Sequence, residues 1–213
     1  MPQVDGSSNT AIRPYRSAYG AIAIREYEQS TCASSKVIQI GDIVSVNTVV
    51  STAFWAVLAP SSQGAVGNLL ENGGGSLLGV CVGVTYGYDG STTGHLPSTV
   101  NAAQTRRVSV AIADGLTEFA INISSVGATP MVPCSSMAQN IYPIERHASA
   151  GDRGGHGVWF LSSTNLSTAA DLSFVVTDVP SDQIGTTGGY VVGKFLSTMV
   201  HRSVRIGGPT VTI

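Results

Sequence analysis

Charge is the property that this sequence has least of. Only 11% of its 213 residues are Asp, Glu, Lys or Arg, against about a quarter in an ordinary soluble domain. Lysine occurs only as Lys36 and Lys194, so exposed helices would have few side chains to solvate them. Because a helical bundle or coiled coil takes about half of its residues from Ala, Glu, Lys, Leu and Arg, both are excluded. The hydrophobic share of 43% is still large enough to build a core.

The sequence also lacks a large excess of positive or negative charge. Eleven basic residues face thirteen acidic ones, the net charge is -2, and no basic run is longer than Arg106-Arg107. Duplex nucleic acid and anionic membranes need a basic patch, and a membrane span needs about 20 apolar residues in a row. We therefore expect neither nucleic acid nor membrane as a partner. The first sixteen residues lack the apolar core of a signal peptide, so we expect synthesis in a cytoplasm.

Cysteine is scarce as well. Cys32, Cys81 and Cys134 are an odd number of residues and lie far apart. A disulfide framework needs an even and denser set, and a zinc site needs close Cys or His partners. We expect these residues to act as small hydrophobic side chains in reducing surroundings.

What the sequence does contain is a series of short β-like runs. Val, Ile and Thr dominate these runs, and turn residues separate them at intervals typical of a barrel or sandwich. The sequence therefore predicts an all-β protein with a small antiparallel barrel. Asp114-Gly115 lies between two alternating runs and predicts a hairpin. The predicted strands are residues 37–40, 43–50, 53–58, 77–88, 107–113, 118–123, 158–162, 172–178 and 189–198.

Three regions are expected along the chain. Residues 1–36 form an extended N-terminal arm and lead-in, residues 37–125 the barrel, and residues 126–213 a second β-rich region with an extended C-terminal tail. Residues 21–28 could be a strand or one helical turn. The loop-like stretches are residues 89–105 and 124–157.

The first twenty residues are small and polar and include two prolines, so by themselves they bury too little apolar area to fold. We expect them to be disordered or laid across a partner. Their anchors would be Arg13, Tyr15, Arg16 and Tyr19, because Arg and Tyr are enriched at interface hot spots.

Candidate chemistry is weak throughout. His147, Asp152 and His156 share one glycine-rich loop but lack the rigid spacing of known metal sites. Residues 151–157 fit neither phosphate-loop pattern, and no GxSxG nucleophile motif occurs. A pair of catalytic carboxylates is unsupported, although sequence alone does not show which carboxylates meet in space. We expect no catalytic residue, no cofactor, no metal and no enzymatic activity.

Aromatic side chains offer one alternative to a purely structural interpretation. Tyr86, Tyr88, Trp55 and Trp159 could form a platform on which sugar rings stack. Aromatic residues make up only 7% of the chain, so core packing is the favoured role for both tryptophans.

The order of three segments resembles a known family. The segments are IQIGDIVSV, LLGVCVGVTYGYDG and VSVAIADGLTEFAINI. They are similar to the auxiliary head proteins of tailed bacteriophages, the capsid decoration or cement proteins with a small barrel or β-tulip core. The similarity covers residues 37–123 and extends toward 172–201. The positions that carry it are Gly41, Asp42, Leu78, Gly79, Val80, Gly83, Tyr86, Val108, Val110, Asp114, Phe119 and Ile121.

The resemblance implies a virion structural protein on the outer surface of the head, made in the host bacterial cytoplasm. Its partners would be the major capsid protein and neighbouring copies of itself, in a homo-oligomer such as a trimer or dimer. It would bridge neighbouring subunits and stabilise the mature capsid. The alternatives are another virion component (a spike, fibre-base or shell subunit) and a glycan-binding or hydrolytic β domain.

Overall fold

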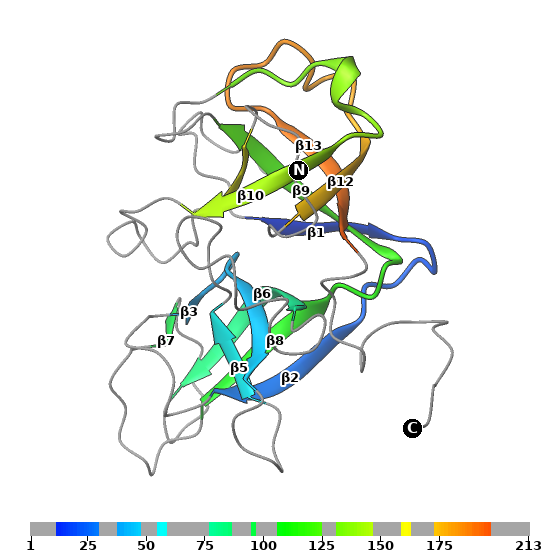
Figure 1. The fold of residues 1–213 in the computed structure, drawn as a ribbon. Coiled ribbons are helices and arrows are strands. Elements are labelled where there is room, and N and C mark those ends of the chain that lie inside the picture. The colour runs from blue at the N-terminus through cyan, green and yellow to red at the C-terminus, as the bar shows by residue number, and fades with distance from the viewer. Residues whose placement is uncertain are drawn as a thin grey trace, which may run out of the picture.

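A computed structural model describes residues 12–29, 38–47, 55–58, 77–86, 95–96, 106–124, 131–146, 159–162 and 173–196. Strands account for nearly all of the regular structure in these ranges, apart from the short 3-10 helix η1 (Ser135–Met137) (Figure 1). The all-β prediction is therefore confirmed. The strands are β1 (Arg13–Ser17), β2 (Ile24–Gln29), β3 (Ile38–Gln39), β4 (Ile43–Asn47), β5 (Trp55–Leu58), β6 (Leu77–Tyr86), β7 (His95–Leu96), β8 (Arg106–Ile112), β9 (Thr117–Ser124), β10 (Ile141–Arg146), β11 (Trp159–Ser162), β12 (Ser173–Asp178) and β13 (Tyr190–Phe195).

Five of these strands form a small closed barrel, in the order β2-β5-β4-β6-β8, which we call the barrel unit. Its pairs are antiparallel except β2–β5, which is parallel, so the barrel is mixed. Strand β8 shows why the sequence folds this way. Val108 and Val110 are fully buried, whereas Arg107 is exposed and Ser109 is partly exposed. This period of two is that of a strand with one face in a core.

The remaining long strands form a second sheet, in the order β1-β9-β11-β10-β12-β13. Strand β9 also pairs with β13. The five strands β9, β11, β10, β12 and β13 are therefore hydrogen-bonded in a closed ring. Ala120 shows the double role of β9, because it lies opposite Arg13 of β1 and opposite Val192 of β13. A second β-rich region is thus present, as the sequence predicts, and β10, β11, β12 and β13 lie within the predicted residues 126–213.

The predicted hairpin at Asp114-Gly115 is wrong. Strand β8 pairs with β2 and β6, whereas β9 pairs with β1, β11 and β13. The turn instead carries the chain from the barrel unit to the second sheet. Asp114 Oδ1 accepts hydrogen bonds from the backbone N–H groups of Leu116 and Thr117, both at 2.9 Å, and Gly115 has a φ of 83°. An Asp-Gly turn fixes the local bend, but the partners of the two strands are decided by distant residues.

A second crossing runs beside this one. Residues 18–23 lead from β1 in the second sheet to β2 in the barrel unit. Ala18 N donates to Leu116 O at 3.1 Å, and Ile112 N donates to Ala23 O at 2.9 Å. The barrel unit is therefore an insertion between β1 and β9. The strand pairing differs from the expected division at residues 36 and 125, because β1 and β9 belong to the second sheet and β2 to the barrel.

Three strands lie where the sequence predicts none. Strand β1 occupies part of the predicted arm, β7 part of the predicted loop 89–105, and β10 part of the predicted loop 124–157. Strand β10 contains Pro143, which removes one backbone donor and weakens the strand signal. It pairs with β12 through residues 141–143 and with β11 through residues 144–146. The strand therefore changes partner at the proline.

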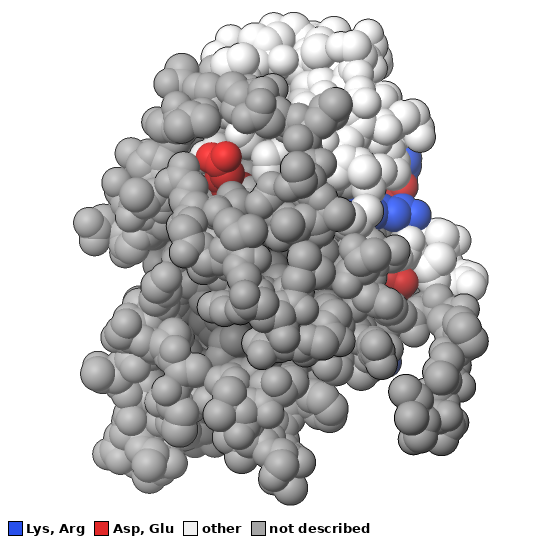
Figure 2. All heavy atoms as spheres, viewed as in Figure 1, with Lys and Arg blue, Asp and Glu red and all other residues white. Residues whose placement is uncertain are grey.

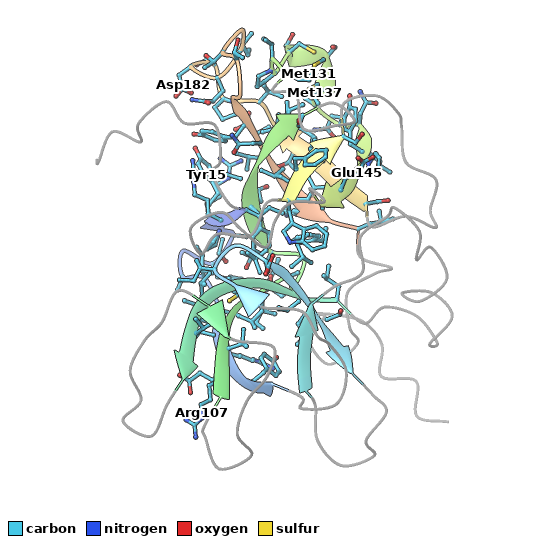
Figure 3. All side chains as sticks on the ribbon, turned by 90° about the vertical axis from the view of Figure 1, so that its left-hand side faces the viewer. Tyr15, Arg107, Met131, Met137, Glu145 and Asp182 are labelled. Carbon is cyan, nitrogen blue, oxygen red and sulfur yellow. The ribbon has the colours of Figure 1, made fainter. Side chains whose placement is uncertain are left out.

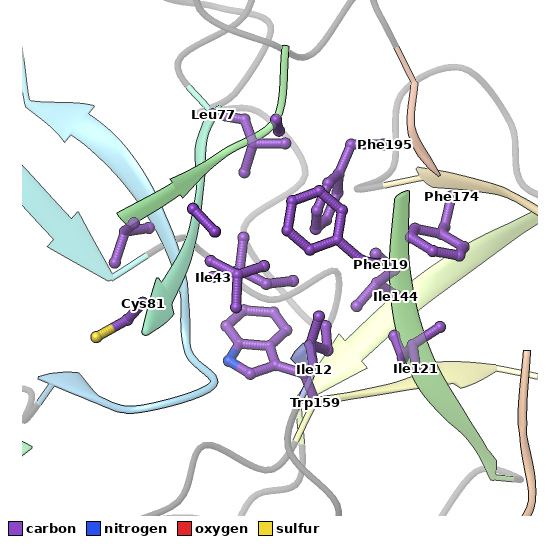
Figure 4. Packing of buried hydrophobic residues seen from close by; sticks show 14 of the residues in the cluster. Ile12, Ile43, Leu77, Cys81, Phe119, Ile121, Ile144, Trp159, Phe174 and Phe195 are labelled. Atoms are coloured by element: carbon purple, nitrogen blue, oxygen red, sulfur yellow. The ribbon is translucent and has the colours of Figure 1, made fainter. Parts of the chain in front are cut away.

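One hydrophobic core spans both parts of the molecule. Ile43 and Leu77 of the barrel unit lie against Phe119 and Trp159 of the second sheet (Figure 4). All four side chains are at most 2% exposed. Burial of Trp159 confirms its predicted role in the core, whereas the side chain of Trp55 lies outside the described part of the structure.

A buried carboxylate lies at the junction between the two parts. Asp42 is 0% exposed, and its Oδ1 accepts a hydrogen bond from Trp159 Nε1 at 2.9 Å. Two backbone bonds with Cys81 fix the turn that carries Asp42, from Gly41 N to Cys81 O at 2.7 Å and from Cys81 N to Asp42 O at 2.8 Å. A buried carboxylate is costly without such partners. The Gly-Asp pair is therefore part of the contact between barrel and sheet.

Two glycines of β6 differ in how closely the neighbouring strand β8 approaches them. A Cβ at Gly79 would lie 2.0 Å from the carbonyl oxygen of Ala111, whereas a Cβ at Gly83 would be in ordinary contact, 3.5 Å from Ser109. We expect Gly79→Ala to lower the free energy of unfolding by about 2–4 kcal/mol, because the backbone of β8 has to move. Gly83→Ala is the matched control, with a loss below about 1 kcal/mol. Urea unfolding of the two variants measures both values, and equal losses would contradict the close approach.

The described cysteines differ sharply in surroundings, which gives a second test. Burial, with a smaller contribution from the nearby Asp42, raises the pKa of the Cys81 thiol to about 12. Cys134 is exposed, contrary to the expectation of a small buried hydrophobe. Because the thiolate is the reactive form, a maleimide at pH 8 should label Cys134 in the folded protein and leave Cys81 unlabelled until the protein unfolds. Peptide mapping by mass spectrometry, which also separates Cys32, reports each site, and fast labelling of Cys81 in the native state would refute the fold around it.

Candidate functional site

The residues predicted as partner anchors lie within the fold. Arg13, Tyr15 and Arg16 belong to strand β1, which pairs with β9, and Tyr19 lies in the crossing that follows. The prediction of an arm without structure of its own is therefore wrong for residues 13–17. The long-range pairing with β9 supplies the order that the local sequence does not. Residues 1–11 lie outside the described part of the chain.

Two tyrosines and two arginines contact one another on this surface. The guanidinium of Arg13 lies over the ring of Tyr190 with Cζ 4.9 Å from the ring centroid, and that of Arg16 lies over Tyr15 at 5.7 Å. The two rings lie 6.2 Å apart at an angle of 52°. We call Arg13, Tyr15, Arg16 and Tyr190 the Arg–Tyr cluster. It joins β1 to β13 across β9, and Figure 3 shows Tyr15 on the outside of the second sheet.

Tyr190 is held by the loop before it as well as by the cluster. Its backbone N donates to Gln183 Oε1 at 3.4 Å. Burial raises the pKa of its hydroxyl, and the neighbouring Tyr15 and Asp182 raise it further, while Arg13 lowers it. The hydroxyl therefore stays protonated at neutral pH and can donate a hydrogen bond.

Arg16 is tied into a network of carboxylates. Its Nε hydrogen-bonds to Glu118 Oε2, and its Nη2 lies 3.7 Å from Asp178 Oδ2. Glu118 also accepts a hydrogen bond from Thr177 at 3.1 Å and lies 4.0 Å from Lys194 Nζ. The hydrogen bond with Glu118 raises the pKa of Arg16. Arg16 therefore fastens β1 to β9 and β12, and its charge is already balanced within the chain.

An exposed apolar surface lies beyond the cluster, at the end of the second sheet. Met131, Val132 and Ile184 are 38%, 44% and 45% exposed, and we call them the apolar tip. Two backbone bonds join the loops that carry them, from Gly185 N to Pro133 O at 3.1 Å and from Gly188 N to Met131 O at 3.0 Å. Figure 3 shows Met131 at this end of the molecule. The tip is thus a fixed surface of two joined loops.

In the described part of the surface in Figure 2, blue and red atoms lie close together at the right-hand margin, and a separate red group lies toward the upper left. Among the described residues, no group of three His, Cys, Asp or Glu side chains could hold a metal ion. The candidate loop of His147, Asp152 and His156 lies outside the described ranges. Within those ranges, no helix has the length and apolar character needed to cross a membrane.

The sequence pointed to three of the four residues of the Arg–Tyr cluster and missed Tyr190, as well as Glu118, the partner of Arg16. Arg13, Tyr15 and Arg16 were predictable because Arg and Tyr stand together in a short polar segment. Tyr190 and Glu118 come from β13 and β9, and Glu118 is separated from Arg16 by 102 positions. Nothing in the local sequence around Tyr190 links it to the first strand, so only the sheet order reveals the cluster.

The fastening role of Arg16 leads to a test by hydrogen exchange. We expect Arg16→Ala to speed amide exchange in β1 and to lower stability by about 1 kcal/mol or less, because the pair is partly exposed. Arg107→Ala is the matched control, since Arg107 and Glu26 form a single pair at 3.3 Å with both side chains more than half exposed. Mass-spectrometric exchange over residues 13–17 measures the effect. Unchanged exchange in β1 would show that Arg16 does not hold the strand.

Comparison with known proteins gives no relative, because no family model, curated protein or solved structure matches this chain. The residues of the chain and the geometry of the Arg–Tyr cluster are therefore the basis for its function.

Proposed function

We propose that this chain is a non-enzymatic virion structural protein, a decoration or cement protein that binds the outer shell of a tailed-phage head. The observation that carries the proposal is the Arg–Tyr cluster, an ordered and partly exposed group of the residue types that dominate interface energetics. Tyr15 is 40% exposed and Tyr19 is 75% exposed. The resemblance of residues 37–123 to decoration proteins supplies the kind of assembly.

Two structural features suit a contact role. The cluster lies on paired strands, so binding does not have to order a flexible segment at about 1–2 kcal/mol per residue. The barrel and the sheet share one core, so the chain acts as a stiff body with surfaces at both ends. A stiff body that touches two neighbours can bridge them, whether these are shell subunits or further copies of the chain.

Binding alone is sufficient for the proposed activity. A protein that binds only the mature shell adds its binding free energy to that state and to no other. The mature shell is then stabilised against disruption by as much as the two affinities differ. Because a head offers the same site many times, each contact can be modest.

The proposal is tested by adding the purified protein to heads that lack it. We expect it to sediment with expanded heads, to bind unexpanded heads weakly, and to raise the temperature at which the expanded heads break open. A protein that binds neither form of head would overturn the proposal. Copy number per head separates a decoration protein from a spike or fibre-base component, which is present in far fewer copies.

A surface variant locates the contact. We expect Tyr15→Ala to weaken binding to expanded heads about tenfold or more, because truncating an aromatic hot spot costs about 1–2 kcal/mol or more. Ile24→Ala is the matched control, since Ile24 is a large exposed side chain on the barrel unit, 57% exposed. Binding isotherms from sedimentation give both dissociation constants. Equal weakening by the two variants would argue against a contact centred on the cluster.

A further inference from the structure

Arg13 differs from Arg16 and Lys194, two other cations of the second sheet. Arg16 and Lys194 both lie within ion-pair distance of Glu118. Arg13, by contrast, has no carboxylate partner among the described residues, and its one charge-related contact there is with the ring of Tyr190. Its charge is therefore not balanced by an ion pair in the described part of the chain.

The contact with Tyr190 also prepares Arg13 for binding. A guanidinium beside an aromatic face is held by a cation–π attraction of about 0.5–1 kcal/mol at an exposed site. The ring restricts the long side chain before any partner arrives, so less entropy is lost on binding. A guanidinium has five N–H donors and no acceptor, in a planar fork that matches a carboxylate.

The surroundings select the kind of anion. Asp182 lies near enough to influence the Tyr190 hydroxyl, and Asp178 lies beside Arg16. These carboxylates repel a polyanion such as nucleic acid, but a single carboxylate placed at Arg13 avoids most of that repulsion. Figure 3 shows Tyr15 and Asp182 on the same side of the sheet.

The same geometry disfavours a sugar. Stacking of a sugar needs an open aromatic face. Arg13 lies over Tyr190 and Arg16 lies over Tyr15, so each ring already has a guanidinium on one face, and the rings are tilted toward each other at 52°. The cluster thus offers hydrogen-bond donors more readily than flat rings.

We propose that Arg13, held over Tyr190, is the receptor for a carboxylate side chain, Asp or Glu, on the shell protein. This inference rests on the proposed function, and it adds the chemistry of the partner. Arg16 has a different role, because its charge is used within the chain to hold β1 in place. Of the four residues that the sequence groups together, Arg13 is the one that recognises the partner's charge.

The test compares Arg13 variants for binding to expanded heads. We expect Arg13→Ala to weaken binding at least tenfold. Arg13→Lys should weaken it by about fivefold or more, because Lys keeps the charge but lacks the planar fork. Arg107→Ala, which removes an exposed arginine from the barrel unit, should bind as the unaltered protein does. Thermal unfolding of each variant checks that the fold is retained.

Chemical modification of the heads tests the partner. Coupling an amine to head carboxylates with a carbodiimide neutralises them before the protein is added. The ratio of dissociation constants between Arg13→Ala and the unaltered protein should then fall from at least ten to near one. A ratio that stays at ten would overturn the carboxylate receptor, and so would Arg13→Lys binding with unchanged affinity.

The outcomes separate this inference from the proposed function. If the unaltered protein binds heads and Arg13→Ala binds equally well, the receptor is refuted and the decoration role stands. If the unaltered protein binds no heads at all, both are refuted. If Arg107→Ala weakens binding as much as Arg13→Ala does, binding follows overall charge, and a specific site at Arg13 is refuted.

Discussion

The hydrogen bond from Trp159 to Asp42 is the contact on which the rest of the structure depends. A barrel of five short strands has little interior of its own, and the second sheet contributes large side chains such as Phe119 and Trp159 to the core that the two parts share. Asp42 lies in the middle of this boundary, where an ionised carboxylate without partners would cost several kcal/mol. Because Trp159 belongs to the sheet, separating the two parts removes a donor from a buried acid. The two parts are therefore expected to unfold together.

The same boundary explains how contact residues become organised. Ile12 is buried in the shared core, directly before Arg13, so the core holds the start of β1. Pairing with β9 and the carboxylates around Arg16 hold the remainder of the strand. A segment that is too polar to fold alone thus becomes a fixed part of the surface. The Arg–Tyr cluster is then a consequence of burial elsewhere and not of any local preference.

The sequence predicted the strands better than their partners. Every range rich in Val, Ile and Thr overlaps an observed strand, because half-buried strands have a local pattern of period two. Strand β1, with the sequence RPYRS, lacks that pattern. In β10, Pro143 interrupts the pattern, so the strand was not predicted. The Asp114-Gly115 turn is real, but the partners of its flanking strands come from elsewhere in the chain, β2 and β6 for β8 and β1, β11 and β13 for β9. Tyr190 could not be joined to Arg13 for the same reason.

The paired crossings between the two parts have a consequence for the order of folding. Strands β1 and β9 can pair only after the chain between them, about a hundred residues, has closed a loop. If the barrel unit folds first, it brings Ala23 and Ile112 to hydrogen-bonding distance, 2.9 Å, and the remaining loop shrinks to about a dozen residues. The entropy of closure then falls by roughly 2 kcal/mol. The inserted barrel would thus act as the nucleus, and the strand that carries Arg13 and Tyr15 would be among the last elements to be joined to the structure.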